Sequence, residues 1–278
     1  MLISWRLEKM IDLTTFKPQL VGEGDVNIFL FNNDGVFVEP KVDGIRILCH
    51  KKNNEVKLYT RSGADWTKRF EIVLPKIIEG ILGDDVIVDG ELAVLQDGKI
   101  LSSNSVLQKN LQQGQRLVYF IFDVLQIGEE MLFKEMQLTR KQSLRLLIEE
   151  NENVCLIPFT CTNNIVDIQE FYKNVVSKGM EGIVIKNCKP YYPGDRYNWL
   201  KLKPLRTVDL TIISRKERKD SKGWIYTLAE DNKIIGTSSS NLEIDNGSLV
   251  EVGYDIKYPR PDGYKLRFPK ILRIREDK

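Results

Sequence analysis

The residues best suited to chemistry in this sequence are charged side chains at the ends of apolar, strand-like segments. The segment EPKVDGIR, residues 39–46, follows three apolar residues and places Lys41 between two acids and three residues before a glycine. A glycine at such a point lets a ligand approach the backbone closely, and a lysine that has lost its proton is a nucleophile. On its own this segment would suit a solvated charged turn equally well, so its chemical interpretation depends on the charged residues further along the chain.

Four further strand-like segments carry charges that are unusual for their surroundings. Charges in apolar strands cost free energy unless they pair with one another or meet a charged ligand. If the strand ends converge, they form a pocket with several cations, two or three carboxylates and one aromatic ring, which suits a nucleoside triphosphate with a divalent metal ion. The segments are Asp89-Gly90-Glu91, Phe122-Asp123, Glu181-Gly182 and Lys201-Leu202-Lys203.

The sequence excludes several other kinds of site. It has one histidine, His50, and four cysteines at positions 49, 155, 161 and 188, none of them in a CxxC pair. A zinc site, a disulfide framework and histidine-based catalysis are therefore not expected. We expect all four cysteines to be buried or half-buried thiols, and we expect catalysis to depend on Lys, Arg, Asp and Glu.

Length and charge distribution indicate the general class of the protein. The 278 residues suffice for one large or two modest domains. The start lacks the apolar core of a signal peptide and no apolar run could span a membrane, so an intracellular, cytoplasmic protein without membrane contact is expected. The net charge is only +2. Basic residues are concentrated in residues 201–222 and 257–278, and such clusters are typical of nucleic-acid binding.

The residue pattern predicts how these side chains are positioned. Apolar alternation on both sides of Lys41 predicts a β-hairpin, preceded by a strand over residues 29–31. A second hairpin, 46–50 with 56–61, would bring Arg61 near Lys41. Helices are predicted over 66–82, with a break at Pro75, after a capping box of Thr139 and Gln142, and after an N-cap at Asn163 or Asn164. Buried strands are predicted over 86–95 and 117–127.

The segment 204–206 is predicted to be a hinge, because only short strand-like runs come after it. The fold class is therefore α+β: antiparallel sheets with helices packed outside, followed by an all-β barrel. We place the two domains at residues 1–204 and 205–278.

The charged segments, taken together, resemble the motifs of the covalent nucleotidyltransferase superfamily, which contains ATP-dependent DNA ligases, RNA ligases and mRNA capping enzymes. All six motifs occur in the family's order. The resemblance implies an antiparallel-sheet, ATP-grasp-like nucleotidyltransferase domain followed by an OB fold. The matching segments are KVDGIR (41–46), DGEL (89–92), FIFD (120–123), EGIVIK (181–186), WLKLKP (199–204) and RFPKILRIREDK (267–278).

The resemblance implies a catalytic set built on Lys41, which would take AMP covalently from ATP. Asp43 belongs to the same motif. Lys201 and Lys203 lie at i and i+2, so on one strand they would share a face and clamp the α-phosphate. Glu181 and Glu91 would bind Mg²⁺, with Mn²⁺ as an alternative.

The resemblance also implies a set of cofactor-binding residues. Phe122 would stack on adenine, Glu39 would lie at the adenine edge, Glu91 would contact a ribose hydroxyl, and Arg61 would reach ribose or phosphate. Arg46 and Lys186 would belong to the same site. The basic residues of the last motif would reach the β- and γ-phosphates; these are Arg267, Arg273, Arg275 and Lys278, and Lys270 stands where many relatives carry arginine.

The implied function is that of a minimal, monomeric ATP-dependent DNA ligase, without an extra N-terminal DNA-binding domain, acting on nicked duplex DNA. The basic run RKERK (215–219) would help to grip the DNA. Two enzymes of the same superfamily, an RNA ligase and a capping guanylyltransferase, are alternatives. A non-enzymatic alternative is an inactive nucleic-acid-binding protein, which would give no reason for keeping Lys41, Glu181, Lys201 and Lys203 together.

Overall fold

The computed structural model of the chain describes residues 10–108, 110–219, 222–261 and 263–275. The chain divides into two compact units, Met1–Lys203 and Pro204–Lys278, and each has an apolar core of its own. The division falls beside the predicted hinge. No helix within the described ranges combines the length and apolar character needed to cross a membrane.

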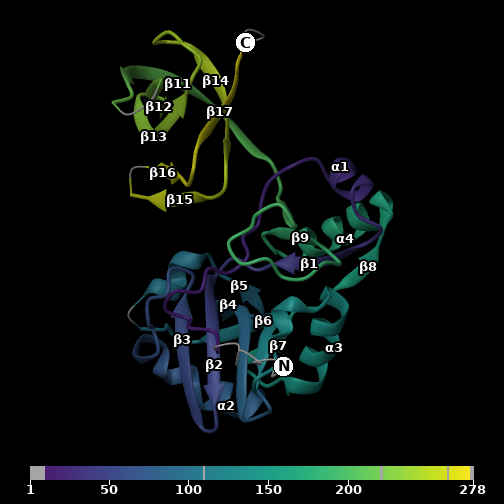
Figure 1. Ribbon diagram of the computed structural model, residues 1–278. Helices are drawn as coiled ribbons and strands as arrows, with labels where there is room; N and C mark the ends of the chain where they lie inside the picture. The colour runs from purple at the N-terminus through teal and green to yellow at the C-terminus, as the bar shows by residue number, and fades with distance from the viewer. Residues whose placement is uncertain (1–9, 109, 220–221, 262, 276–278) are drawn as a thin grey trace. The chain divides into compact units, whose positions relative to one another are not determined.

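The first unit contains two sheets (Figure 1). In the larger sheet the strands follow the order β3-β2-β4-β6-β7, with β5 paired to β4, and in the smaller sheet the order is β10-β9-β1-β8. Neighbouring strands are antiparallel except for the parallel pair β6 and β7. The strands are β1 Val36–Lys41, β2 Ile45–Lys52, β3 Glu55–Thr60, β4 Asp85–Gln96, β5 Lys99–Ile100, β6 Gln115–Ile127, β7 Val154–Leu156, β8 Thr160–Thr162, β9 Gly182–Asn187 and β10 Trp199–Leu202.

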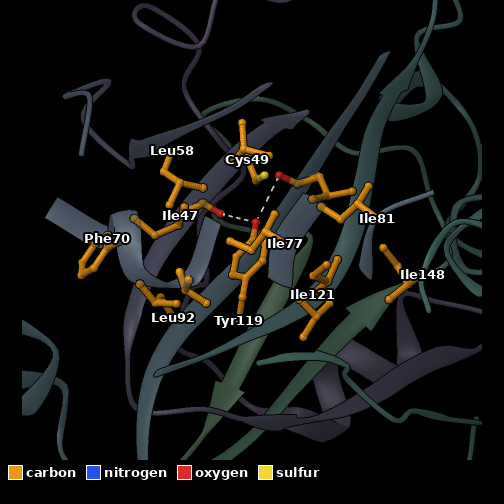
Figure 2. Packing of buried hydrophobic residues seen from close by; sticks show 14 of the residues in the cluster. Ile47, Cys49, Leu58, Phe70, Ile77, Ile81, Leu92, Tyr119, Ile121 and Ile148 are labelled. Atoms are coloured by element: carbon orange, nitrogen blue, oxygen red, sulfur yellow. Dashed lines mark hydrogen bonds between the residues drawn. The ribbon is translucent and has the colours of Figure 1, made fainter. Parts of the chain in front are cut away.

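Helices pack on the outer face of each sheet. The larger sheet is covered by η1 (Lys68–Val73), α2 (Leu74–Gly80) and α3 (Gln137–Leu147), and the smaller one by α1 (Val26–Phe31) and α4 (Ile165–Ser177). Figure 2 shows the first of these cores, in which the Tyr119 hydroxyl donates to the carbonyl of Ile47 at 2.9 Å. Two short 3₁₀ turns, η2 (Ser103–Leu107) and η3 (Leu132–Lys134), are the remaining helical elements among the described residues of the unit.

Side-chain alternation gives the smaller sheet one apolar face and one charged face. Val36 and Val38 of β1 pack with Ile168 of α4 in one apolar core. Glu39 and Lys41 come one and three residues after Val38. Because side chains alternate along a strand, both lie on the opposite face and point away from that helix. On β9 and β10 the same alternation places Lys186 and Lys201 on the face that carries Lys41.

The larger sheet turns a second charged face toward the first. On β4, Val88 and Leu92 belong to the helix-covered core, which leaves Asp89 and Glu91 on the opposite face. The two inner faces meet in a further apolar cluster, in which Leu48, Ile87 and Leu125 of the larger sheet pack with Trp199 of the smaller one. The charged residues of both sheets are therefore brought together by the packing of the sheets.

The hairpin predicted around Lys41 is wrong in one respect. Strands β1 and β2 form as predicted, but they do not pair with each other, because β1 is already flanked by β8 and β9 and β2 by β3 and β4. Residues 42–44 instead carry the chain from one sheet to the other. Lys41 therefore lies at the seam, by which we mean this crossing between the sheets.

Other local predictions are also corrected. Residues 29–31 belong to helix α1, because Asp25 caps its start by accepting from the amides of Asn27 and Ile28 at 2.7 and 3.2 Å. Helix α3 begins at Gln137, so Thr139 lies inside it and forms no capping box. The predicted break at Pro75 is confirmed, since a 3₁₀ helix changes to an α-helix at Leu74. Among the cysteines, Cys161 is exposed, contrary to prediction.

The second unit is a curled five-stranded antiparallel sheet of order β13-β12-β11-β14-β17, with a separate hairpin of β15 and β16 that the sequence did not predict. The two edge strands of this sheet, β13 and β17, approach each other, and the Ile271 amide of β17 donates to the Ser238 hydroxyl of β13 at 3.2 Å. Backbone pairing does not close the barrel within the described residues, as in partly open OB barrels. The strands are β11 Arg206–Glu217, β12 Trp224–Glu230, β13 Lys233–Ser240, β14 Leu249–Tyr254, β15 Lys257–Arg260, β16 Gly263–Leu266 and β17 Lys270–Ile274.

Candidate active site

The centre of the site is an ion-paired cluster at the seam. The Lys41 ammonium pairs with one carboxylate oxygen of Glu181, and the Lys203 ammonium pairs with the other. The three side chains retain 22, 13 and 23% of their exposure, so they are half-buried but reachable from solvent. The structure thus brings together three residues that the sequence assigned to one site from widely separated positions.

Two glycines allow neighbouring segments of the chain to lie close together beside this cluster. A Cβ at Gly44 would lie 2.4 Å from the carbonyl oxygen of Leu92 and 2.9 Å from Cγ of Glu91. A Cβ at Gly182 would lie 2.2 Å from the carbonyl oxygen of Leu202, and its φ of +153° is one that other residues rarely adopt. Both glycines therefore fix the spacing between the strands that carry the charged residues.

Lys201 and Lys203 have different partners, although the sequence predicted that they act as a pair. Lys201 lies on β10 opposite Val184 and pairs with the exposed Glu23 at 2.9 Å. Lys203 lies one residue beyond the end of β10. Both ammonium groups are partly exposed, at 29 and 23%, so each is accessible to an anionic ligand.

Arg46, predicted as a cofactor-binding residue, is held in place by several protein groups. Its guanidinium donates to both carboxylate oxygens of Asp89, at 2.9 and 2.5 Å, and to the Tyr191 hydroxyl at 3.0 Å. The same guanidinium also donates to the backbone carbonyl of Gln19. This bidentate geometry is the strong form of an arginine–carboxylate pair. Arg46 therefore holds the wall of the site together, a role the sequence motif did not reveal.

Glu91 is an acid of the site whose ionisation is strongly perturbed. It lies on β4 opposite Arg46 of β2. Burial raises the pKa of Glu91 to about 7, against the opposing effect of the positive charges on Lys41 and Arg46. A carboxyl group that titrates near neutral pH is characteristic of functional sites.

An aromatic group forms a further side of the site. The Phe122 ring is half-buried and stands edge-on to Trp199, with centroids 6.0 Å apart and an interplanar angle of 80°. The ammonium of Lys186 lies 4.4 Å from the Phe122 centroid and 4.0 Å from that of Trp199. The predicted stacking residue thus lies beside another predicted site residue, while Trp199 was recognised only as part of a motif.

Glu39 and Lys186 form a buried ion pair. Their charged atoms lie 2.7 Å apart, and both side chains are almost fully buried. Burial lowers the pKa of Lys186 to about 8, although the charge of Glu39 acts in the opposite direction. A second lysine, Lys141 of α3, pairs with the other oxygen of Glu39, and nothing in the sequence motifs pointed to it.

The remaining predicted residues of the first unit are Asp43 and Arg61. Asp43 is half-buried in the connection between β1 and β2, and Arg61 is exposed just after β3. Their roles at a nucleotide stay predictions.

The predicted phosphate-binding arginines lie in the second unit, where they pair with local acids. Arg273 pairs with Glu251 at 2.6 Å, and Arg267 lies 3.9 Å from Asp255. Arg275 donates to both oxygens of Asp209, at 2.9 and 3.2 Å. Lys278 lies outside the described residues. Their contact with the β- and γ-phosphates stays a prediction.

Two carboxylates could contribute to a metal site. Glu181 is close enough to Glu91 that its negative charge raises the pKa of Glu91. The described residues contain no group of three or more His, Cys, Asp or Glu arranged to hold a metal ion. Two carboxylates are a donor set of the kind that Mg²⁺ uses, with phosphate oxygens and water completing its shell.

The site lies on the facing surfaces of two sheets, with a lysine at their seam, and a five-stranded, partly open barrel follows in the chain. This arrangement is that of a nucleotidyltransferase domain followed by an OB fold. The fold class predicted from the sequence is confirmed by solved structures of similar fold. The ligase domain of M. tuberculosis LigD matches with a TM-score of 0.60 at 18% identity, over 96% of this chain and 97% of that one. A structure from a study of Lig E DNA ligases matches with a TM-score of 0.62 at 18% identity, over 93% and 99% of the two chains.

Sequence comparison specifies the family. Residues 21–203 match the model of the ATP-dependent DNA ligase domain, so the chain belongs to the ATP-dependent DNA ligase family. A DNA ligase of Methanocorpusculum labreanum is 25% identical over 96% of this chain and 57% of its own length. One of Methanothrix thermoacetophila is 28% identical over 87% and 52%. The chain thus spans about half the length of the curated relatives it matches.

Proposed function

We propose that this chain is an ATP-dependent DNA ligase that seals nicks with a 5′-phosphate and a 3′-hydroxyl through a covalent lysyl-AMP and an adenylylated DNA intermediate. The observation that carries this proposal is the placement of Lys41 at the seam, with Glu181 and Lys203 in direct contact. Residues 1–204 would carry the adenylyltransferase chemistry, and residues 205–278 would form the OB-fold domain.

In the first step, Lys41 must leave Glu181 and lose its proton before its nitrogen can attack the α-phosphorus of ATP. The new P–N bond forms as the bond to the β-phosphate oxygen breaks, and pyrophosphate leaves. Lys201 and Lys203, both partly exposed, suit the stabilisation of charge on the phosphate oxygens. Phe122 would stack on the adenine ring, with Glu39, Glu91, Arg46, Arg61 and Lys186 fixing the orientation of the nucleoside and Asp43 supporting the motif.

A Mg²⁺ ion held by Glu181 and Glu91, or a Mn²⁺ ion in its place, would supply charge neutralisation on the phosphates when bound. Arg267 and Arg273 of the second unit are the groups proposed to orient the leaving pyrophosphate. Their carboxylate partners would then have to give way to phosphate, which an arginine binds with the same bidentate geometry.

The later steps transfer AMP to the 5′-phosphate of the nick and then displace it by the 3′-hydroxyl. Both are in-line phosphoryl transfers that depend on positioning rather than on an acid–base pair. The basic run at residues 215–219 would contribute to the grip on nicked duplex DNA. Because such contacts release counterions, affinity should fall steeply with salt, and nick binding that stays constant between low and moderate salt would contradict this part of the proposal.

The decisive experiment uses α-labelled ATP with Mg²⁺, followed by a denaturing gel and a chase with a nicked duplex. We expect label on the protein that disappears as the nick is sealed. Label from GTP instead of ATP would indicate a capping enzyme, and sealing of a nicked RNA duplex in preference to DNA would indicate an RNA ligase. Absence of any covalent label would leave only a nucleic-acid-binding function. The proposed protein is a monomer and intracellular, which sedimentation and fractionation can test.

A further inference from the structure

Lys141 on helix α3 lies outside every motif of the sequence, yet its ammonium group is inserted among the residues of the proposed nucleotide site. The residue is 2% exposed. Its Nζ pairs with Oε1 of Glu39 and donates to the backbone carbonyl of Phe122 at 2.6 Å. One side chain thus contacts both the acid that precedes Lys41 by two residues and the main chain of the proposed stacking residue.

Glu39 is fixed by this arrangement. One carboxylate oxygen pairs with Lys141 and the other with Lys186 at 2.7 Å. A carboxylate can accept about four hydrogen bonds, so each oxygen keeps capacity for a further donor. The two ammonium groups hold Glu39 in one orientation, and Lys186 connects it to the faces of Phe122 and Trp199.

Lys141 is not needed merely to attach α3 to the sheet. The preceding residue, Arg140, already does so through a buried pair with Asp123, with contacts of 2.7 and 3.1 Å. Burial alone would raise the pKa of Asp123, but the adjacent Arg140 charge holds it below its usual range. Burying a second cation beside the Arg140–Asp123 pair costs free energy. This cost favours a role for Lys141 in orienting Glu39 and Phe122.

We propose that Lys141 is a positioning residue for the nucleobase, and that by fixing the Glu39 carboxylate it makes the site prefer adenine to guanine. The inference rests on the proposed function. Adenine presents an amino donor where guanine presents a carbonyl acceptor. A fixed carboxylate accepts from the donor and repels the acceptor, whereas a mobile one discriminates less.

The test compares Lys141→Met with Lys51→Met in the full chain. Lys51 is a matched control because it is also buried, at 7% exposure, and donates to a backbone carbonyl, that of Gly83, at 2.8 Å. The rate of covalent labelling is measured against the concentrations of ATP and of GTP. We expect Lys141→Met to raise KM for ATP about tenfold, to change kcat less than about threefold, and to reduce the ATP-to-GTP preference about tenfold. Lys51→Met should leave KM and the preference unchanged.

A purely structural role would reduce the amount of active protein without changing the ratio of the two nucleotides, so an unchanged preference in Lys141→Met overturns the inference. If that variant does not fold, Lys141→Arg serves instead. Its planar guanidinium cannot reproduce both contacts, so the preference should fall at least threefold, and an unchanged preference has the same meaning. In a Glu39→Gln background, Lys141→Met should add less than twofold. A wild-type protein that takes no label from either nucleotide would instead overturn the proposed function.

Discussion

The carboxylate of Glu181 lies between the ammonium groups of Lys41 and Lys203, with one oxygen on each. Glu181 immediately precedes β9, and its amide donates to the carbonyl of Lys41 at 3.2 Å, so backbone pairing as well as charge fixes this contact. The acid therefore controls where the candidate nucleophile rests before any nucleotide is bound.

Replacing Lys41 should remove the covalent adduct altogether. Lys41→Ala is expected to take no label from α-labelled ATP, because no other amine occupies its place at the end of β1. Lys57→Ala, at an exposed position of β3, should label like the wild type. A labelled Lys41→Ala protein would show that another residue is the nucleophile.

Glu181→Gln should slow adenylylation at least about 100-fold, a loss of roughly 3 kcal/mol in the barrier. The change removes the negative charge that both lysines share and that the proposed metal ion would need. Glu23→Gln is the matched control, since Glu23 is 76% exposed and pairs with Lys201 at 2.9 Å. Its rate should stay within about threefold of the wild type, and equal losses in the two variants would argue against a special role for Glu181.

Glu91→Gln should change how stability depends on pH. The pKa of Glu91 is raised by burial to about 7 in the folded protein, from 4.5. Between these values the folded state binds more protons than the unfolded state, so stability falls as pH rises through the window. At pH 8 the variant should be more stable than the wild type by up to about 3 kcal/mol.

Denaturant unfolding of the Glu91 variant at pH 5 and pH 8 measures this effect. The difference between the two pH values should be smaller in Glu91→Gln than in the wild type. Glu79→Gln, an exposed change on α2, should leave the wild-type difference in place. Parallel pH curves for wild type and Glu91→Gln would contradict the assignment.

Gly44→Ala should impair both stability and adenylylation. The added Cβ would lie 2.4 Å from the Leu92 carbonyl oxygen, so β4 or the connection after Lys41 must shift. We expect a loss of about 2 kcal/mol or more in the free energy of unfolding. Gly35→Ala adds a Cβ whose nearest neighbour is at 3.9 Å, and thermal unfolding should show little change. A Gly44→Ala protein with the wild-type melting temperature and rate would show that the connection adapts freely.

Arg273 on β17 and Arg275 just after it should differ in their effects, the first on adenylylation and the second on stability. Arg273 is 59% exposed, so Arg273→Ala should cost little stability, about 0.5 kcal/mol, but slow adenylylation about tenfold if it orients pyrophosphate. Arg275 is 13% exposed and contacts Asp209 with two hydrogen bonds, so Arg275→Ala should lose about 1–3 kcal/mol. Unfolding and labelling of both variants decide this, and equal behaviour would contradict the distinction.

Much of the site could be predicted because local pattern and chemistry agree. Lys41, Glu181 and Lys203 lie at strand ends whose apolar alternation is readable from the sequence, and the structure brings them into contact. Strands β4 and β6 were recognised for the same reason. Of the two predicted N-cap candidates, Asn163 and Asn164, it is Asn164 that caps α4, because its side chain accepts from the Val166 amide at 2.9 Å.

Other features depend on pairing between distant segments, which local pattern does not encode. The alternation around Lys41 indicates two strands but not that their edges are taken by other partners, so the hairpin was wrong. The contacts of Arg46 with Asp89 and Tyr191 join three distant segments. Lys141 lies in an ordinary helical stretch, and only packing of α3 against β6 reveals what it contacts.

The seam has a mechanical meaning as well as a chemical one. A nucleotide joined to Lys41 would be attached covalently to the smaller sheet while its base and sugar lay against Phe122 and Glu91 of the larger one. AMP would then link the two sheets until it is transferred to the DNA. Each round of the proposed reaction would begin by making this part of the protein more rigid and end by making it more flexible. The rigidity of the two sheets would therefore indicate whether Lys41 carries AMP.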